Sequence, residues 1–105
     1  MLEVICDAFG TVLGLSGKLD VHTAADVRNA LVDAVAAGSG ELVLDLSALE
    51  AVDATGLGVL VGAHRRAQRA GRTLVLVDVQ VPVARLLLVT RLDRVLAIRR
   101  TEHCV

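Results

Sequence analysis

Apolar positions recur along this chain with the two periods that distinguish strands from helices. Every second residue from Leu2 to Ala8 is apolar, with Glu3 and Asp7 between them, which is the pattern of a half-buried strand. Segment 10–17, GTVLGLSG, predicts the partner strand of a hairpin, ending at Gly17. Two later segments, ELVLDLS (41–47) and RTLVLVDV (72–79), are short, branched and almost wholly apolar, as expected of buried central strands.

Three further segments have the period of a helix. The first begins near Thr23, a predicted N-cap, and ends at the glycines around residue 39. Its apolar face consists of Val27, Leu31, Ala34 and Val35. The second is Leu57–Ala70, closed by Gly71, and the third runs through Val83–Val89 with Pro82 in its first turn. Segment 94–98, RVLAI, predicts a last short strand.

The resulting order, β-β-α-β-α-β-α-β, predicts one α/β domain over residues 1–105. We expect a mixed four- to five-stranded sheet with helices packed mainly on one face. The chain has 105 residues, 54% of them apolar, which is enough for a real core.

Composition narrows the classes of partner. The net charge is −1 and Phe9 is the sole aromatic residue, so neither a general attraction to nucleic acid nor a base-stacking surface is expected. The longest apolar stretches are too short to span a membrane, and the first residues lack the basic start of a signal peptide. We therefore expect a cytoplasmic protein without membrane insertion, in which Cys6 and Cys104 are free thiols.

The segment EAVDATGLGVLVG (50–62) is the main candidate for chemistry. Its glycines, Gly56, Gly58 and Gly62, resemble a dinucleotide-binding fingerprint, which must join a strand directly to its helix. The strand Leu42–Leu46 is expected to stop about ten residues earlier, which argues against that function. No lysine follows the glycines, so a phosphate-binding loop of the Walker type is excluded. The alternative is that the glycines allow close helix packing.

The residue types needed for catalysis or metal binding are not grouped in the sequence. His22, His64 and His103 occur singly, and we expect each to be exposed or to face a partner. The two cysteines lack the spacing of metal ligands. We therefore expect no enzyme activity, no cofactor and no metal.

Asp53 is a predicted cap for the second helix, because a carboxylate at this position accepts bonds from backbone N–H groups one turn in. A hydroxyl on the next residues, such as that of Thr55, would lie at the positive end of the helix dipole. A phosphate there would add about −1.5 to −2 charges and change a docking surface. The alternative is that Thr55 only supports the cap.

Three segments, in order and without a large gap, resemble the STAS domain of bacterial anti-sigma factor antagonists. They are SGKLDVHTAADVRNAL (16–31), the central segment 42–79 that contains DATGLG, and VPVARLLLVTRLDRVLAI (81–98). The resemblance implies a protein that binds an anti-sigma factor, often a serine kinase of the histidine-kinase-like fold, and so releases a sigma factor. It also implies switching by phosphorylation, which a phosphatase reverses.

Carried over residue by residue, the resemblance assigns Asp20 to the acid near the docking site and Asp53 to the acid before the phosphoacceptor. Two positions depart from the family pattern. Ala54 occupies the phosphoacceptor position and has no hydroxyl, so Thr55 is the candidate substitute. Lys18 stands where the family usually has Glu. The predicted partner-binding residues are Lys18, Asp20, His22, Asp53, Thr55, Gly56, Leu57 and Gly58.

Two other functions stay open at this point. STAS domains also occur beside transporter ATPases, where a structural or regulatory subunit needs no phosphoacceptor. A STAS domain could also bind a nucleotide itself. In each case we expect a monomer or a weak dimer.

Overall fold

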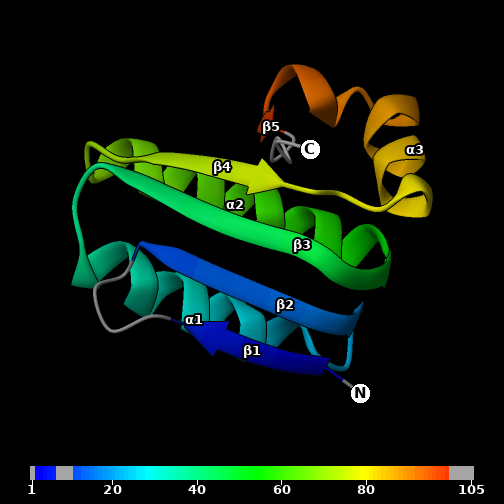
Figure 1. Ribbon diagram of the computed structural model, residues 1–105, viewed down its shortest axis with the longest axis horizontal. Coiled ribbons are helices and arrows are strands. Elements are labelled where there is room, and N and C mark those ends of the chain that lie inside the picture. Colours follow the sequence, from blue (N-terminus) through cyan, green and yellow to red (C-terminus); the bar gives the residue numbers. More distant parts are fainter. Residues whose placement is uncertain (1, 7–10, 100–105) are drawn as a thin grey trace, which may run out of the picture.

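The computed structural model describes residues 2–6 and 11–99, which form one mixed sheet with helices packed against it (Figure 1). Its elements, in chain order, are β1 (Leu2–Cys6), β2 (Val12–Leu19), α1 (Ala24–Ala37), β3 (Glu41–Val52), α2 (Ala54–Arg69), β4 (Thr73–Val77), α3 (Val81–Val89), the single 3₁₀ turn η1 (Leu92–Arg94) and β5 (Ala97–Arg99). The predicted order of strands and helices is confirmed. The turn η1 occupies the beginning of the segment where a strand was expected, so β5 starts only at Ala97.

The sheet has the order β1-β2-β3-β4-β5, with β1 antiparallel to β2 and every other pair parallel. Figure 1 shows α1 and α2 side by side behind the sheet, α1 behind β1 and β2 and α2 behind β3 and β4. Helix α3 follows the carboxyl end of β4 and adds Val83 and Leu87 to the same core. The predicted mixed sheet, with helices mainly on one face, is confirmed.

The core is aliphatic, and its buried residues recur with the spacing that the sequence predicts for strands and helices. In β3 the residues Leu42, Leu44 and Leu46 are fully buried, and Leu74 and Leu76 of β4 lie beside them. All four residues of the predicted apolar face of α1 are buried. Each such side chain contributes about 1.5–3 kcal/mol when removed from water, so this layer accounts for the association of helices with sheet.

Strand β3 is longer than predicted, since it continues through SALEAV to Val52 rather than stopping near Leu46. Two register shifts in its pairing with β2 change the phase of burial, so the buried residue after Leu46 is Leu49 rather than residue 48. This break in the period-two pattern conceals the second half of the strand in the sequence. Strand β2 likewise continues past Gly17 to Leu19.

The longer β3 corrects one argument against dinucleotide binding, because only Asp53 separates the strand from α2. Helix α2 also begins at Ala54, three residues before the predicted start. All three glycines of the segment therefore lie inside the helix. A phosphate-binding fingerprint needs its first glycines in the turn between strand and helix, so the structure does not reproduce that motif.

Arg72 is a buried cation that holds the carboxyl end of α1, and the sequence analysis did not identify this role. It is 4% exposed, directly before β4. Its Nη1 donates to the carbonyls of Ala34 (2.8 Å) and Val35 (3.2 Å), and its Nε to that of Gly40 (3.0 Å). Helix α1 has no basic residue in its last turn. Arg72 therefore supplies both hydrogen bonds and positive charge to carbonyls that lack an intrahelical partner.

Replacing this guanidinium should destabilise the whole domain. For Arg72→Ala we expect a loss of about 2–3 kcal/mol in the free energy of unfolding, because buried carbonyls lose charged donors. Arg72→Lys should recover only part of it, since an ammonium cannot reproduce the planar fork. Urea unfolding measures both variants, with the exposed Arg65→Ala as control. A loss for Arg72→Ala as small as that of the control would contradict the assignment.

Candidate functional site

The carboxyl ends of β2 and β3 bring two short segments together. The strands are parallel neighbours, and Leu19 is paired with Val52 at their ends. The turn that follows β2, residues 20–23, therefore lies against the junction where Asp53 leads into α2. The resemblance assigned an acid to each of these segments, and the sheet places both acids at one edge.

Asp53 joins the two segments with both oxygens of its carboxylate. Oδ1 accepts from the backbone N–H of Gly56 (2.8 Å) and Oδ2 from that of Val21 (3.1 Å). The backbone N–H of Asp53 donates to the carbonyl of Leu19 (3.1 Å). The predicted helix cap is confirmed, and the bond to Val21 is a further role that only the fold reveals.

Asp20 orders the turn before α1. Its Oδ1 accepts from the backbone N–H groups of His22 (2.9 Å) and Thr23 (3.2 Å). The pKa of Asp20 lies below its usual value: partial desolvation raises it, but the hydrogen bonds from these two N–H groups and the nearby His22 outweigh that effect. The carboxylate is thus ionised near neutral pH and holds the turn.

Thr23 occupies the N-cap position of α1, as predicted, but its side chain makes no capping bond to the helix. Its hydroxyl instead donates to the carbonyl of Lys18 (3.0 Å) and accepts from the backbone N–H of Asp20 (3.0 Å). The expected capping function is therefore wrong. The hydroxyl is used within the turn because the turn folds back on the end of β2.

Two residues predicted to bind a partner are buried. Leu57 is 7% exposed and belongs to the core. Gly56 is also buried: a Cβ built on it would lie 2.6 Å from Cγ2 of Val52 and 2.7 Å from the carbonyl oxygen of Leu19. These two residues hold α2 close to the ends of β2 and β3, and they present no side chain at the surface.

The remaining predicted residues surround an exposed area, here called the junction face. It consists of Lys18, Val21, His22, Ala54, Thr55 and Gly58, all of which are exposed. Ala54 and Thr55 are the first two residues of α2, so both lie at the positive end of the helix dipole. Val21 was not singled out by sequence. It is an apolar residue in a polar turn, 63% exposed, and its backbone is held by Asp53.

Metal-binding residue types are dispersed over the described part of the chain. Within 2–6 and 11–99, no three His, Cys, Asp or Glu side chains are arranged to hold a metal ion. His22 is exposed, but His64 is half-buried and its Nδ1 is buried without a hydrogen-bond partner in the described part of the chain, which corrects the expectation of exposure. His103 and Cys104 lie outside the described residues. No described helix has the length and apolar character to cross a membrane.

Two glycines of α2 provide a matched pair for testing how closely this helix packs against the ends of β2 and β3. Gly56→Ala should destabilise the domain by about 1–3 kcal/mol, because its methyl group meets backbone as well as side chains. Gly58→Ala should stabilise it by about 0.5–1 kcal/mol, because nothing lies within 4 Å of its Cβ and alanine favours the helix. Thermal or urea unfolding measures both. Equal effects of the two variants would show that α2 does not approach Leu19 as described.

The turn at Asp20 should respond to acid. The pKa of Asp20 is lower in the folded state than its ordinary value of 3.8. The carboxylate therefore contributes fully to folding stability above pH 3.8, and this contribution is lost as the pH falls through the lowered pKa. Protection of the His22 and Thr23 amides, measured as the exchange rate relative to the intrinsic rate at each pH, should therefore fall only in that acidic range. In Asp20→Asn this pH dependence of protection should disappear. A loss of protection at pH 5 to 6, roughly one unit or more above the ordinary value, would assign the effect to another group.

Comparison with known proteins agrees with this architecture. A family model of the STAS domain matches residues 2–104. The chain is 35% identical to an anti-sigma F factor antagonist of Paenibacillus polymyxa over 92 residues, which are 87% of this chain and 79% of the relative. It is 32% identical to an anti-sigma-B factor antagonist of Listeria monocytogenes over 88 residues, 84% of this chain and 77% of the relative.

A solved structure, that of an anti-sigma factor antagonist from Mycobacterium paratuberculosis, superposes with a TM-score of 0.84 at 26% identity. The match covers 96% of this chain and 87% of the other. Fold, sequence and the order of the matched segments agree. The chain belongs to the STAS domain family, and the three relatives named above are anti-sigma factor antagonists.

Proposed function

We propose that this protein is an anti-sigma factor antagonist, which binds an anti-sigma factor through the junction face and catalyses no reaction. The observation that carries the proposal is the junction held by Asp53: it presents the start of α2 beside the turn of Val21 and His22, in a chain related to antagonists. Asp20 and Asp53 serve this surface by shaping it, since both carboxylates accept backbone hydrogen bonds.

Ala54 sets the regulation that we propose. It is exposed at the first helical position, where a phosphate would meet the positive end of the dipole, but its methyl group accepts no phosphate. The side chain of Thr55 points about 100° away around the helix, so a kinase aligned for residue 54 does not reach it in the same pose. The complex with a kinase-type anti-sigma factor should therefore persist in ATP, and no phosphatase is needed to restore it.

Restoring the hydroxyl tests this regulation directly. The protein, its Ala54→Ser variant and its Thr55→Ala variant would each be mixed with the kinase-type anti-sigma factor encoded in the same genome. Complexes would be measured by gel filtration with and without Mg-ATP, and phosphate by intact mass. We expect only Ala54→Ser to gain a phosphate and release its partner. Release of the natural protein with a phosphate on Thr55 would make Thr55 the switch, and release without any phosphate would contradict both forms of regulation.

The position of the binding surface has its own test. Val21→Asp should weaken binding at least about 10-fold, or about 1.4 kcal/mol, because it replaces an exposed apolar side chain of the junction face with a charge. Ile5→Asp is the matched control, since Ile5 is equally exposed at 64% but pairs with Gly14, far from the end of β2. Equal loss of binding in both variants, with folding intact, would show that the interface lies elsewhere on the domain.

The function itself has a separate test, tagged capture of the partner from cell extract. Recovery of a transporter ATPase instead of an anti-sigma factor would contradict the proposed function.

A further inference from the structure

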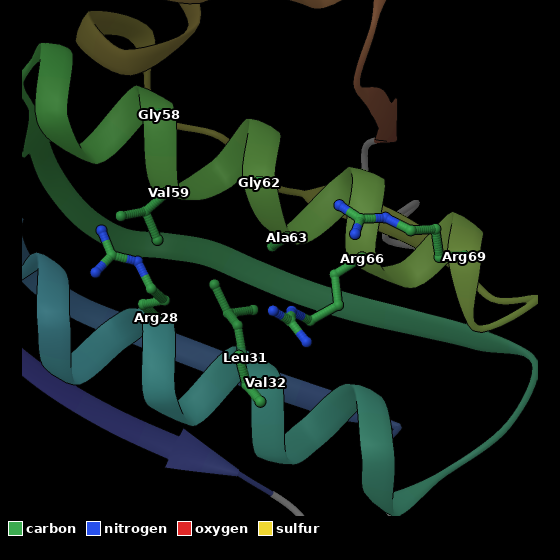
Figure 2. Close-up of a pocket in the computed structure, with 9 residues that line it drawn as sticks. All are labelled: Arg28, Leu31, Val32, Gly58, Val59, Gly62, Ala63, Arg66 and Arg69. Carbon is green, nitrogen blue, oxygen red and sulfur yellow. The ribbon is translucent and has the colours of Figure 1, made fainter.

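A groove between α1 and α2 begins where the junction face ends. Its first part has a volume of about 230 Å³, with a floor that includes Leu31, Val59 and Ala63 (Figure 2). A second hollow of about 400 Å³ shares Val32, Arg66 and Arg69 with the first and continues to Ala70. From Gly58 to Ala70, the residue after the end of α2, the groove extends over twelve residue steps, which is about 18 Å at the rise of an α-helix.

Two exposed glycines keep this groove open. Gly58 and Gly62 are four residues apart and so lie on one side of α2, along the groove. A Cβ on either would meet nothing within 4 Å, so packing inside the domain does not require glycine there. Glycine within a helix is less stable than alanine, because its backbone loses more conformational freedom on folding. The domain therefore gives up helix stability at two positions that only open the groove.

The rim of the groove is positively charged. Arg28 of α1 and Arg66 and Arg69 of α2 line it, and Figure 2 shows the guanidinium groups of Arg28 and Arg66 reaching toward the space between the helices. Within the described residues none of the three forms an ion pair, and no Asp or Glu lines either hollow. In a chain of net charge −1 this is a local excess of positive charge. Three guanidinium groups in this arrangement favour carboxylates.

We propose that the groove binds an acidic amphipathic helix of a partner protein. Apolar side chains at helical spacing would cover the floor, and carboxylates on either side would pair with the arginines. A length of about 18 Å accommodates roughly three turns of helix. The groove is open along this length, whereas small-molecule sites enclose most of their ligand. The inference does not depend on the proposed function, because the groove shares only Gly58 with the junction face and its recognition chemistry is different.

The test uses a fluorescein-labelled synthetic helix of roughly three turns, with leucines at i, i+3, i+4 and i+7 and glutamates beside them. A second peptide carries lysine at each glutamate. Anisotropy gives the affinity, and ¹H–¹⁵N shift changes locate the site. We expect saturable binding of the acidic peptide alone, shift changes along α1 and α2, and weakening as salt is raised.

Variants of the protein make the result specific. The pair Arg28→Glu and Arg66→Glu together should reduce affinity for the acidic peptide at least about 10-fold, whereas Arg65→Glu, which is exposed on α2 outside the groove, should change it less than about 2-fold. Gly62→Leu should block binding while the melting temperature is unchanged or raised, because it fills the groove without meeting packed atoms.

Four results with the peptides would overturn the proposal. They are no saturable binding at about 1 mM peptide, equal binding of the lysine peptide, insensitivity to the charge reversals, or shift changes confined to the junction face. Anionic phosphatidylglycerol vesicles are the remaining comparison. Binding to them that Arg28→Glu and Arg66→Glu abolish, without binding of the acidic peptide, would assign the arginines to a membrane surface and overturn the proposal as well.

Discussion

The junction face of this protein depends on one carboxylate, that of Asp53. One oxygen caps α2 through Gly56 and the other holds the backbone of Val21 in the turn before α1. The two segments are 32 residues apart in sequence, and they meet because β2 and β3 are parallel neighbours that end together. Gly56 is the steric counterpart of this interaction, since any side chain there would collide with the backbone of Leu19. Charge and close packing thus fix the same junction.

Helix α1 is held at both ends by groups outside it. At its beginning, Asp20 and Thr23 order the preceding turn, and at its end the guanidinium of Arg72 binds the last carbonyls. Because α2 is fixed in turn by Asp53 and by the buried Leu57, the separation between the two helices is set by these contacts. The arginine-lined groove lies between these two helices.

The residues that the family resemblance brings to attention divide into two groups once the fold is known. Asp20, Asp53, Gly56 and Leu57 shape the surface from beneath or within it, through hydrogen bonds and packing. Ala54, Thr55, Lys18 and His22 are exposed at the surface. Sequence similarity alone assigns both groups to one site, because a family retains the residues that build a surface as well as those that contact a partner.

The sequence by itself determined the order of elements, the aliphatic core and the apolar faces of the helices, because these follow from local periods and from burial of branched side chains. It also indicated the Asp53 cap, a contact between residues three apart. Only the tertiary structure decided the length of β3, where bulges shift the burial period. The same holds for Arg72 and for the second bond of Asp53, whose partners are more than thirty residues away. Such contacts leave no local pattern, since they arise from the pairing of distant strands.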